Sequence, residues 1–310
     1  MAVRTLSENI TERLTQNKKI HEGEFMEKLI ITGLLSIFIS SAQAAPNIIY
    51  GEDNRVDVYA STDAALVELS KSTLAMIPKN AVSKGFWTNE LTLKMETLVD
   101  RGMCASEPFS DQPTAANCSG FLVSDRHVVT AGHCVQNLSD CKSNYFVFDY
   151  KMNDANSIST RLDPNNVFEC KAIIARTLNS INQDDYALVE LARPVTDRRP
   201  LNFRRSGTIE VGQKLAVIGH PTGLPTKIAD GAEVRSVSGK YFTTNLDTFG
   251  GNSGSAVFNL DTLEVEGILV RGGQDYIRKG GCMVSNQVAN DAGRGEDVTR
   301  ITNIKALLSL

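Results

Sequence analysis

The sequence predicts an all-β protein, because short β-rich runs dominate it from Cys118 onward and helical periodicity is rare. Residues typical of turns (Gly, Pro, Asn and Asp) separate these runs, which include SGFLVS, HVVTAG, YFVFDY, YALVEL, KLAVIGH, SAVF and VEGILV. Short strands with turn residues between them are typical of a β-sandwich or a β-barrel. A chain of 310 residues with this many strands has room for two barrels packed together.

The elements on either side of these strands are less regular. Residues 65–77 have a mixed pattern that predicts a short helix and then a strand at Thr73 to Ile77, and Leu91 to Val99 is also mixed. The join between two barrels is expected in ARPVTDRRPLNFRRSG, residues 192–207. The spacing of the apolar residues from Asp297 to Leu308 predicts a closing helix.

The N-terminal region contains the pattern of an export signal. The apolar run LIITGLLSIFI, residues 29–39, follows Lys28, is too short to span a bilayer, and ends near an A-x-A cleavage site. This predicts a signal peptide over residues 26–44, cut after Ala44. The preceding residues, 1–25, are polar, and the codons for their last residues admit a ribosome-binding site before an ATG. We therefore expect translation to start at Met26 in a bacterium, and the mature protein to be secreted or periplasmic.

Charge and cysteine content exclude several classes of function. The formal net charge is −4, so no basic excess indicates nucleic-acid binding, and no second apolar run predicts a membrane anchor after signal cleavage. All six cysteines follow the signal, which in an exported chain predicts disulfides with 15 possible connectivities. Their spacing does not fit a zinc site. We expect no metal, no cofactor and a monomer.

The segment DTFGGNSGSAVF, residues 247–258, places Ser253 between glycines directly before an apolar strand. One interpretation is a tight turn, because glycine allows positive φ angles. The other is a nucleophilic serine, which needs a histidine as base and an acid to orient that histidine. Of the histidines beyond the signal, His127 fits a solvated hairpin and His220 fits a strand end. His133 differs, because the strand before it stops at small residues (VVTAGHC) that leave space around the imidazole.

Three segments resemble the trypsin-like serine proteases. CSGFLVS and VVTAGHC are similar to the part of that family in which a cysteine pair, here Cys118 and Cys134, brackets the catalytic histidine. DDYALVEL resembles the aspartate segment, with Asp185 as the acid and Asp184 as a solvated loop residue. GGNSGS resembles the nucleophile loop of the bacterial glutamyl-endopeptidase branch, and IIYGEDNRVDV resembles the start of its mature enzymes. The resemblance covers most of residues 48–275.

This resemblance implies two packed six-stranded antiparallel β-barrels of the chymotrypsin type with a short C-terminal helix. It also implies that His133, Asp185 and Ser253 hydrolyse peptide bonds through an acyl-enzyme, while the N–H groups of Gly251 and Ser253 hold the oxyanion. The chain order His, Asp, Ser excludes an α/β-hydrolase, in which the serine comes first within G-x-S-x-G. A catalytically silent binding module and an esterase remain the alternatives.

The resemblance also divides the chain and suggests disulfides. The expected parts are an extension (1–25), the signal peptide (26–44), an N-terminal segment (45–100), a first barrel with the histidine and the aspartate (101–197), and a second barrel with the serine and the closing helix (198–310). The family pairing implies a Cys118–Cys134 disulfide. For the other four cysteines we expect Cys141–Cys170, which spans a modest loop, and Cys104–Cys282, which ties the N-terminal segment to the second barrel.

Two positions depart from the family pattern. Asn252 stands where trypsin-like enzymes have an aspartate that pairs with a freed N-terminal ammonium, so we expect neutral hydrogen bonds to hold the nucleophile loop. The strand GILVRG, residues 267–272, has an apolar residue where the family has a serine that helps to hold the catalytic aspartate. Asp185 must therefore find other hydrogen-bond donors.

The residue six before the nucleophile predicts the substrate preference, because in the family it lies at the base of the pocket for the side chain preceding the cut. That residue is Asp247, and a buried acid is costly to desolvate unless a cation meets it. Leu269 stands where the glutamyl branch needs a histidine. We expect protein or peptide substrates cut after Arg or Lys, bound by Asp247, Thr248, Leu269 and Gly272. The alternatives are a preference for Glu or for small residues, the latter if Asp247 turns away to cap a loop or to pair with Arg271.

Overall fold

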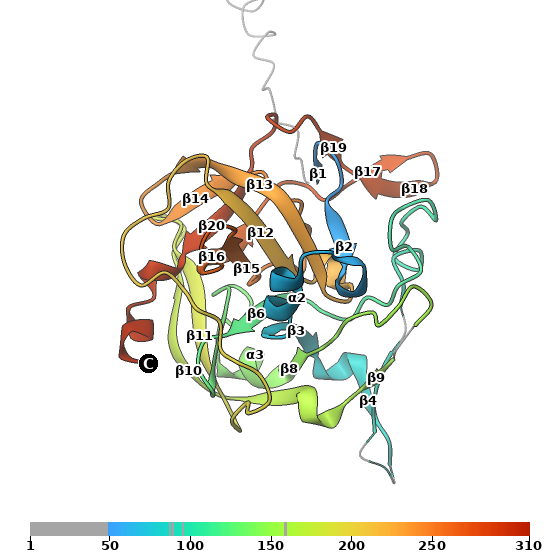
Figure 1. The fold of residues 1–310 in the computed structure, drawn as a ribbon. Coiled ribbons are helices and arrows are strands. Elements are labelled where there is room, and N and C mark those ends of the chain that lie inside the picture. Colours follow the sequence, from blue (N-terminus) through green and yellow to red (C-terminus); the bar gives the residue numbers. More distant parts are fainter. Residues whose placement is uncertain (1–48, 87, 89, 95, 158–159) are drawn as a thin grey trace, which may run out of the picture. The chain divides into compact units, whose positions relative to one another are not determined.

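The computed structural model describes residues 49–86, 88, 90–94, 96–157 and 160–310. The expected signal peptide and the extension before it lie outside these residues. Strands are the main regular elements of the described chain, and Figure 1 shows how they are arranged. No helix in these ranges is long and apolar enough to cross a membrane.

The first barrel is a closed antiparallel sheet with the strand order β10-β11-β7-β6-β3-β8, in which β8 pairs again with β10. Its strands are β3 (Thr73–Pro78), β6 (Cys118–Leu122), β7 (His127–Thr130), β8 (Asn144–Phe148), β10 (Val167–Leu178) and β11 (Asp185–Leu191). The barrel therefore begins before the boundary expected at residue 101, because β3 is one of its six strands. This strand is almost wholly buried. Large buried side chains fill its interior, among them Phe146, Phe148 and Phe168.

The second barrel is also closed, in the order β12-β15-β16-β20-β14-β13, with β13 pairing back to β12. Its strands are β12 (Lys214–Gly219), β13 (Lys227–Val237), β14 (Tyr241–Thr244), β15 (Ala256–Asn259), β16 (Val265–Arg271) and β20 (Glu296–Arg300). The short strand β2 (Arg55–Asp57) adds to β13 from outside the barrel. In this way Arg55–Asp57, near the N-terminal end of the described chain, extend the sheet of the second barrel.

Shorter elements surround the barrels. The remaining strands are β1 (Ile49–Tyr50), which pairs in parallel with β19 (Gln287–Val288); β17 (Tyr276–Lys279), which pairs with β18 (Cys282–Ser285); and the sheet of β4 (Val82–Lys84), β5 (Leu91–Leu93) and β9 (Arg161–Leu162). The α-helices of the described residues are α2 (Ala64–Ser70) and α3 (Leu138–Ser143). The 3-10 helices are η1 (Val58–Ala60), η2 (Lys79–Ala81), η3 (Pro164–Asn166), η4 (Pro221–Gly223), η5 (Ile301–Asn303) and η6 (Lys305–Ser309).

The helix expected within residues 65–77 is present as α2, and the strand expected after it is β3. The side chain of Asp63 caps α2 by accepting hydrogen bonds from the backbone N–H groups of Ala65 and Leu66. Leu66 is completely buried, so the helix is fixed by one capping residue and one buried apolar residue.

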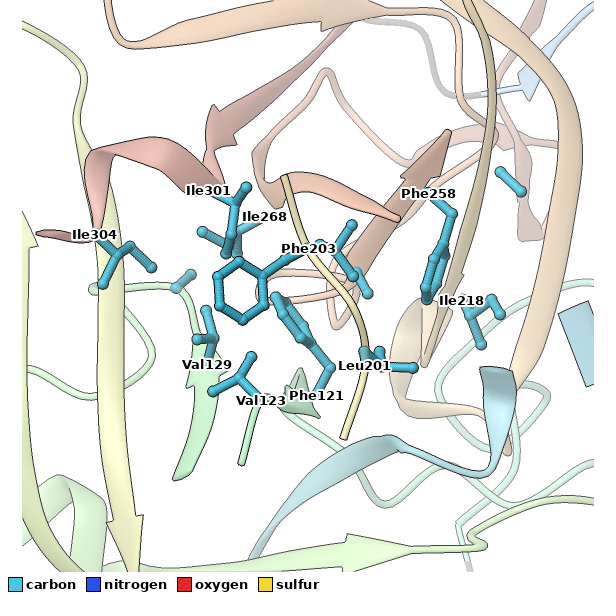
Figure 2. Packing of buried hydrophobic residues seen from close by; sticks show 14 of the residues in the cluster. Phe121, Val123, Val129, Leu201, Phe203, Ile218, Phe258, Ile268, Ile301 and Ile304 are labelled. Carbon is cyan, nitrogen blue, oxygen red and sulfur yellow. The ribbon is translucent and has the colours of Figure 1, made fainter. Parts of the chain in front are cut away.

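One apolar cluster joins the two barrels. Phe121 and Val129 of the first barrel pack with Ile218 and Phe258 of the second, and Phe203 of the connecting segment lies among them (Figure 2). Removing this apolar surface from water stabilises the barrel pair by roughly 25 cal/mol for each Å² buried. The cluster therefore holds together the two halves that carry the histidine and the serine.

The end of the chain corrects the expected closing helix. The residues from Asp297 to Arg300 belong to strand β20, and only the short turns η5 and η6 follow. Ile301, Ile304 and Leu307 are spaced by three, as on a helix, but they belong to these 3-10 turns and are buried in the cluster between the barrels.

Candidate active site

His133 lies where β7 ends, and the register of the first barrel places Asp185 next to it. Thr130 of β7 opposes Ala187 of β11, so the chain that continues to His133 runs beside the start of β11. Gly132 is needed in between, because a Cβ at this position would lie 1.9 Å from the carbonyl oxygen of Thr177. The small residues before the histidine thus permit a close approach to β10 and β11.

The aspartate orients the imidazole through two contacts. Nδ1 of His133 is 2.8 Å from Oδ2 of Asp185, and the backbone N–H of His133 donates to Oδ1 at 3.1 Å. Asp185 is 2% exposed, whereas the side chain of His133 is about one-third exposed. A carboxylate at Nδ1 holds the proton there and leaves Nε2 as the basic nitrogen. The arrangement therefore provides a general base that faces solvent.

The hydrogen-bond donor that Asp185 was expected to need is the backbone N–H of His133. Among the described residues, both contacts of the Asp185 carboxylate come from His133. The neighbouring Asp184 is not solvated as expected. It is buried and accepts a hydrogen bond from Nδ2 of Asn303 at 2.8 Å, and burial raises the pKa of its carboxyl. Asp184 thus anchors the C-terminal segment.

The loop that carries Ser253 requires glycine on both sides of the serine. Gly251 and Gly254 have φ angles of 98° and 93°. A Cβ on Gly251 would lie 2.5 Å from the carbonyl oxygen of His220, and one on Gly254 would lie 2.0 Å from that of Ser119. The G-N-S-G sequence is therefore explained by positive φ angles together with close packing against two other segments.

Ser119 of strand β6 holds this loop across the barrel interface. Its N–H donates to the carbonyl oxygen of Ser253 at 2.8 Å, and its hydroxyl donates to that of Gly251 at 2.8 Å. The N–H groups of Gly251 and Ser253 donate to no residue in the described chain. Two N–H groups of one loop without a protein acceptor can bind an oxyanion.

Neutral contacts hold Asn252, as expected from the missing aspartate. Its side chain is buried, its Oδ1 accepts from the hydroxyl of Ser255 at 3.2 Å, and its N–H donates to the carbonyl oxygen of Phe249 at 2.9 Å. The loop is also held by Asp275, whose Oδ2 accepts from the N–H of Gly250 at 2.6 Å. Among the described residues no ion pair includes this loop.

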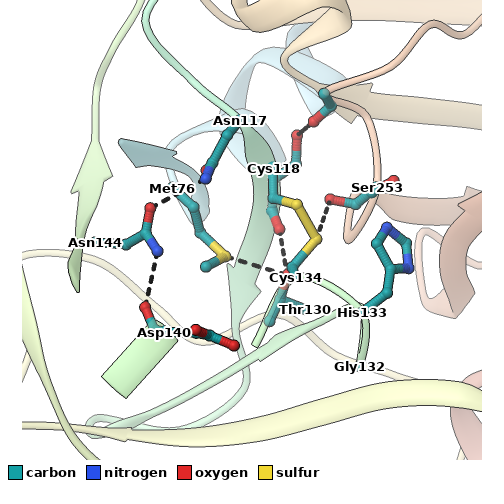
Figure 3. Close-up of a disulfide and its surroundings, with 12 residues drawn as sticks. Met76, Asn117, Cys118, Thr130, Gly132, His133, Cys134, Asp140, Asn144 and Ser253 are labelled. Carbon is teal, nitrogen blue, oxygen red and sulfur yellow. Dashed lines mark hydrogen bonds between the residues drawn. A yellow bond between two sulfur atoms is a disulfide. The ribbon is translucent and has the colours of Figure 1, made fainter. Parts of the chain in front are cut away.

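Disulfides brace the site. The three bonds are Cys118–Cys134, Cys141–Cys170 and Cys104–Cys282, which are the pairings expected from the sequence. Figure 3 shows the Cys118–Cys134 bond, with Sγ of Cys134 3.7 Å from the carbonyl oxygen of Ser253. Cys118, Cys134 and His133 form the one group of possible metal ligands in the described chain, but both sulfurs are in a disulfide and no thiolate is available.

Two pockets open beside these residues and share a wall made by Val270 and Arg271. The larger, about 680 Å³, is lined by His133, Asp185 and Leu178. The smaller, about 130 Å³, lies against Ser253. Oγ of Ser253 makes no hydrogen bond to a described residue, and such serine–histidine contacts are often long before substrate binds. The histidine and the serine thus border neighbouring cavities.

The smaller pocket contains three of the four residues expected to bind substrate. Thr248, Leu269 and Gly272 line it, but Asp247 does not. Asp247 is 4% exposed, and its two oxygens accept from the N–H groups of Tyr50 (2.8 Å) and Asn54 (3.0 Å). Burial raises the pKa of its carboxyl to about 6. The prediction that Asp247 forms the pocket floor is wrong, because the N-terminal segment occupies both of its oxygens.

Two acids line this pocket, Asp275 and Glu296, and the sequence analysis identified neither. Oε2 of Glu296 accepts from the hydroxyl of Thr248 at 2.7 Å, and burial raises the pKa of the carboxyl to about 8. Glu296 was difficult to identify from the sequence, because it directly precedes Asp297, the start of the predicted closing helix. A strand assignment there would have placed Glu296 beside the end of β16.

Comparison with known proteins agrees with this geometry. Residues 118–268 match the family of the trypsin-like peptidase domain. A solved Glu endopeptidase in complex with MPD is 15% identical, with a TM-score of 0.50, over 84% of this chain and 96% of that chain. The VesB protease of Vibrio cholerae is 14% identical, with a TM-score of 0.48, over 85% of this chain and 67% of that chain. No curated protein sequence matches the chain.

The paired barrels define the chymotrypsin fold. Residues 118–268 carry a trypsin-like peptidase domain, and the chain is a serine endopeptidase.

Proposed function

We propose that this endopeptidase cleaves its substrates with His133, Asp185 and Ser253 as a catalytic triad. The observation that carries the proposal is the buried contact of 2.8 Å between Nδ1 of His133 and Oδ2 of Asp185. It leaves Nε2 as the proton acceptor, in a cavity that shares a wall with the pocket of Ser253. A weak serine nucleophile needs such a base to react at neutral pH.

In acylation, Oγ of Ser253 attacks the peptide carbonyl carbon and Nε2 of His133 takes the hydroxyl proton. The negative charge on the carbonyl oxygen is stabilised by the N–H groups of Gly251 and Ser253. Nε2–H then protonates the leaving amine as the C–N bond breaks. Throughout, Asp185 stabilises the imidazolium without taking its proton.

In deacylation, water attacks the ester carbon and gives a proton to Nε2. The same two N–H groups bind the second oxyanion, and the proton returns to Oγ as the C–O bond breaks. The carboxylic acid product leaves and the serine is regenerated. The cycle needs no cofactor.

Three further points complete the proposal. The protein acts outside the cytoplasm, which agrees with three disulfides and no free cysteine among the described residues. It works as a monomer on protein or peptide substrates. It prefers a basic residue before the cut, because an acid lines the pocket beside Ser253. Intact mass of the purified mature protein, expected to begin at Ala45, tests the export step.

The triad is tested with Ser253→Ala, which we expect to lower kcat on casein by on the order of 10⁶-fold while circular dichroism stays unchanged. A fluorophosphonate probe should label the wild type and not this variant. His127→Ala is a matched control for His133→Ala, because His127 contacts only Ser124 by side chain in the described chain. A Ser253→Ala protein that still digests casein would exclude the triad, and a wild type that resists the probe and digests nothing would favour the silent binding module.

A further inference from the structure

The pocket beside Ser253 contains a buried carboxylate without a cation. Glu296 is 2% exposed. Its oxygens accept from the hydroxyl of Thr248 at 2.7 Å, from the N–H of Gly273 at 3.4 Å and from the hydroxyl of Tyr50 at 3.4 Å. In the described chain no Lys, Arg or His nitrogen lies within 4.0 Å of it. Buried charges in proteins are normally paired, so this carboxylate lacks the partner that it would normally have.

The backbone of the pocket wall makes room for this carboxylate. Arg271 of β16 opposes Asp297 of β20, which brings Gly272 beside Glu296. A Cβ on Gly272 would lie 1.9 Å from Oε2 of Glu296. Only glycine at this position leaves the space that the carboxylate occupies. The carboxylate therefore lies at the pocket wall, in a cavity bordered by the nucleophile.

The other charged groups of the pocket do not neutralise Glu296. Arg271 lines the pocket but is engaged by Oδ2 of Asp297 and by the carbonyl oxygen of Gln183. Arg294 is bound to the same Asp297. Asp275 adds a second acid, which accepts from the N–H of Gly250. The described lining of the cavity thus holds two acids, and its one cationic side chain, Arg271, is already engaged.

We propose that Glu296 is the residue that selects a Lys or Arg side chain before the cut, by forming an ion pair with its cationic end. The inference rests on the proposed function, since it concerns the substrate of the same site. The proposal assigns the selectivity to Glu296 of strand β20 rather than to Asp247, which binds the N-terminal segment. Asp275 and Thr248 assist by adding negative potential and by orienting the carboxylate.

The selectivity should depend on pH. Burial raises the pKa of Glu296 to about 8 in the free enzyme, Asp275 raises it further, and the hydrogen bonds from Thr248 and Gly273 and the charge of Arg294 oppose the rise. Tyr50, Arg271 and Asp297 face the same region. A cationic side chain favours the ionised acid, so its binding releases a proton below pH 8. Preference for a basic residue therefore increases as pH rises through 8.

The test compares two fluorogenic peptides that differ only before the cut, one with lysine and one with its uncharged analogue norleucine. The ratio of their kcat/KM values cancels any pH effect that is common to both peptides. In the wild type the ratio should favour lysine and increase from pH 7 to pH 9. In Glu296→Gln it should fall by about 10- to 100-fold and become independent of pH. Asp247→Asn should leave the ratio within about 3-fold of the wild type.

The inference is overturned if Glu296→Gln keeps the lysine preference, if Asp247→Asn abolishes it, or if the wild type prefers norleucine. If Glu296→Gln does not fold, the inference is tested by the wild-type ratio alone. A ratio that stays constant from pH 7 to pH 9 overturns the inference. Labelling by a fluorophosphonate distinguishes failure of the Glu296 inference from failure of the proposed triad. An enzyme that is labelled but does not prefer lysine contradicts the role of Glu296 alone, whereas an unlabelled wild type contradicts the triad as well.

Discussion

Asp185 and Glu296 are both buried carboxylates beside the cleft, and they differ in what meets them. Asp185 has its partner within the chain, the imidazole of His133. Glu296 meets a hydroxyl, a phenol and one N–H, and it faces a cavity. A buried charge whose partner belongs to the fold orients that partner, whereas one without a cation is available to a ligand. The comparison separates the acid that we propose for the chemistry, Asp185, from the acid that we propose for substrate recognition, Glu296.

The largest expected effect concerns the acid that orients the histidine. Asp185→Asn should lower kcat by on the order of 10⁴-fold at pH 7, because an amide no longer holds the proton on Nδ1. Steady-state kinetics on a lysine peptide measure this. Asp184→Asn is the matched control, since an asparagine there still accepts from Asn303, and it should keep near wild-type kcat. A loss of less than about 10-fold in Asp185→Asn would show that this acid does not orient the base.

The next largest effect concerns the space that Gly272 leaves for the carboxylate of Glu296. Gly272→Ala adds a Cβ that would lie 1.9 Å from Oε2 of Glu296, so the carboxylate must move. A displacement of about 1 Å can lower kcat/KM by on the order of 100-fold, and we expect that loss for lysine peptides. Labelling of Ser253 by a small fluorophosphonate should change little. The control is Gly239→Ala, where an added Cβ meets nothing within 4 Å. Equal loss of labelling and of lysine turnover would contradict a role restricted to recognition.

The smallest effect concerns Asp247, the acid that binds the N-terminal segment. Its pKa is raised from 3.8 to about 6 in the folded protein, so the fold disfavours its ionised form. Between pH 4 and pH 6 the unfolded chain binds fewer protons at this site, so stability falls as pH rises. The loss by pH 7 should be about 3 kcal/mol.

Urea unfolding of a Ser253→Ala background, which cannot digest itself, measures this dependence. Asp247→Asn should remove that part of the pH dependence, whereas Asp230→Asn, at an exposed position, should retain it. Identical curves for Asp247→Asn and its parent would show that the carboxyl titrates normally.

The residues of the proposed triad could be predicted from sequence because their signals are local. The small residues before His133, the acid at the start of an apolar strand and the glycines around Ser253 each lie within about six residues of the group concerned. The structure explains the first and the third of these signals, since Gly132 and Gly254 are required by close backbone contacts. The barrels followed from the alternation of strands and turns.

The pocket could not be predicted in the same way, because it depends on distant pairings. Asp247 binds N–H groups nearly 200 residues earlier in the chain, and no spacing near residue 247 reveals this. Glu296 reaches the pocket through the register of β16 and β20. The three-residue spacing of Ile301, Ile304 and Leu307 imitates a helix and concealed that strand.

The two hydrogen bonds that Ser119 makes across the barrel interface also bear on the stage of folding at which proteolytic activity can arise. A nascent chain in which only the first barrel has formed contains His133 and Asp185 but not the loop of Ser253, which strand β6 supports in the complete fold. If these residues form the proposed triad, proteolytic activity arises only when the two barrels dock. The division of the proposed site between two barrels then keeps partly folded chains inactive.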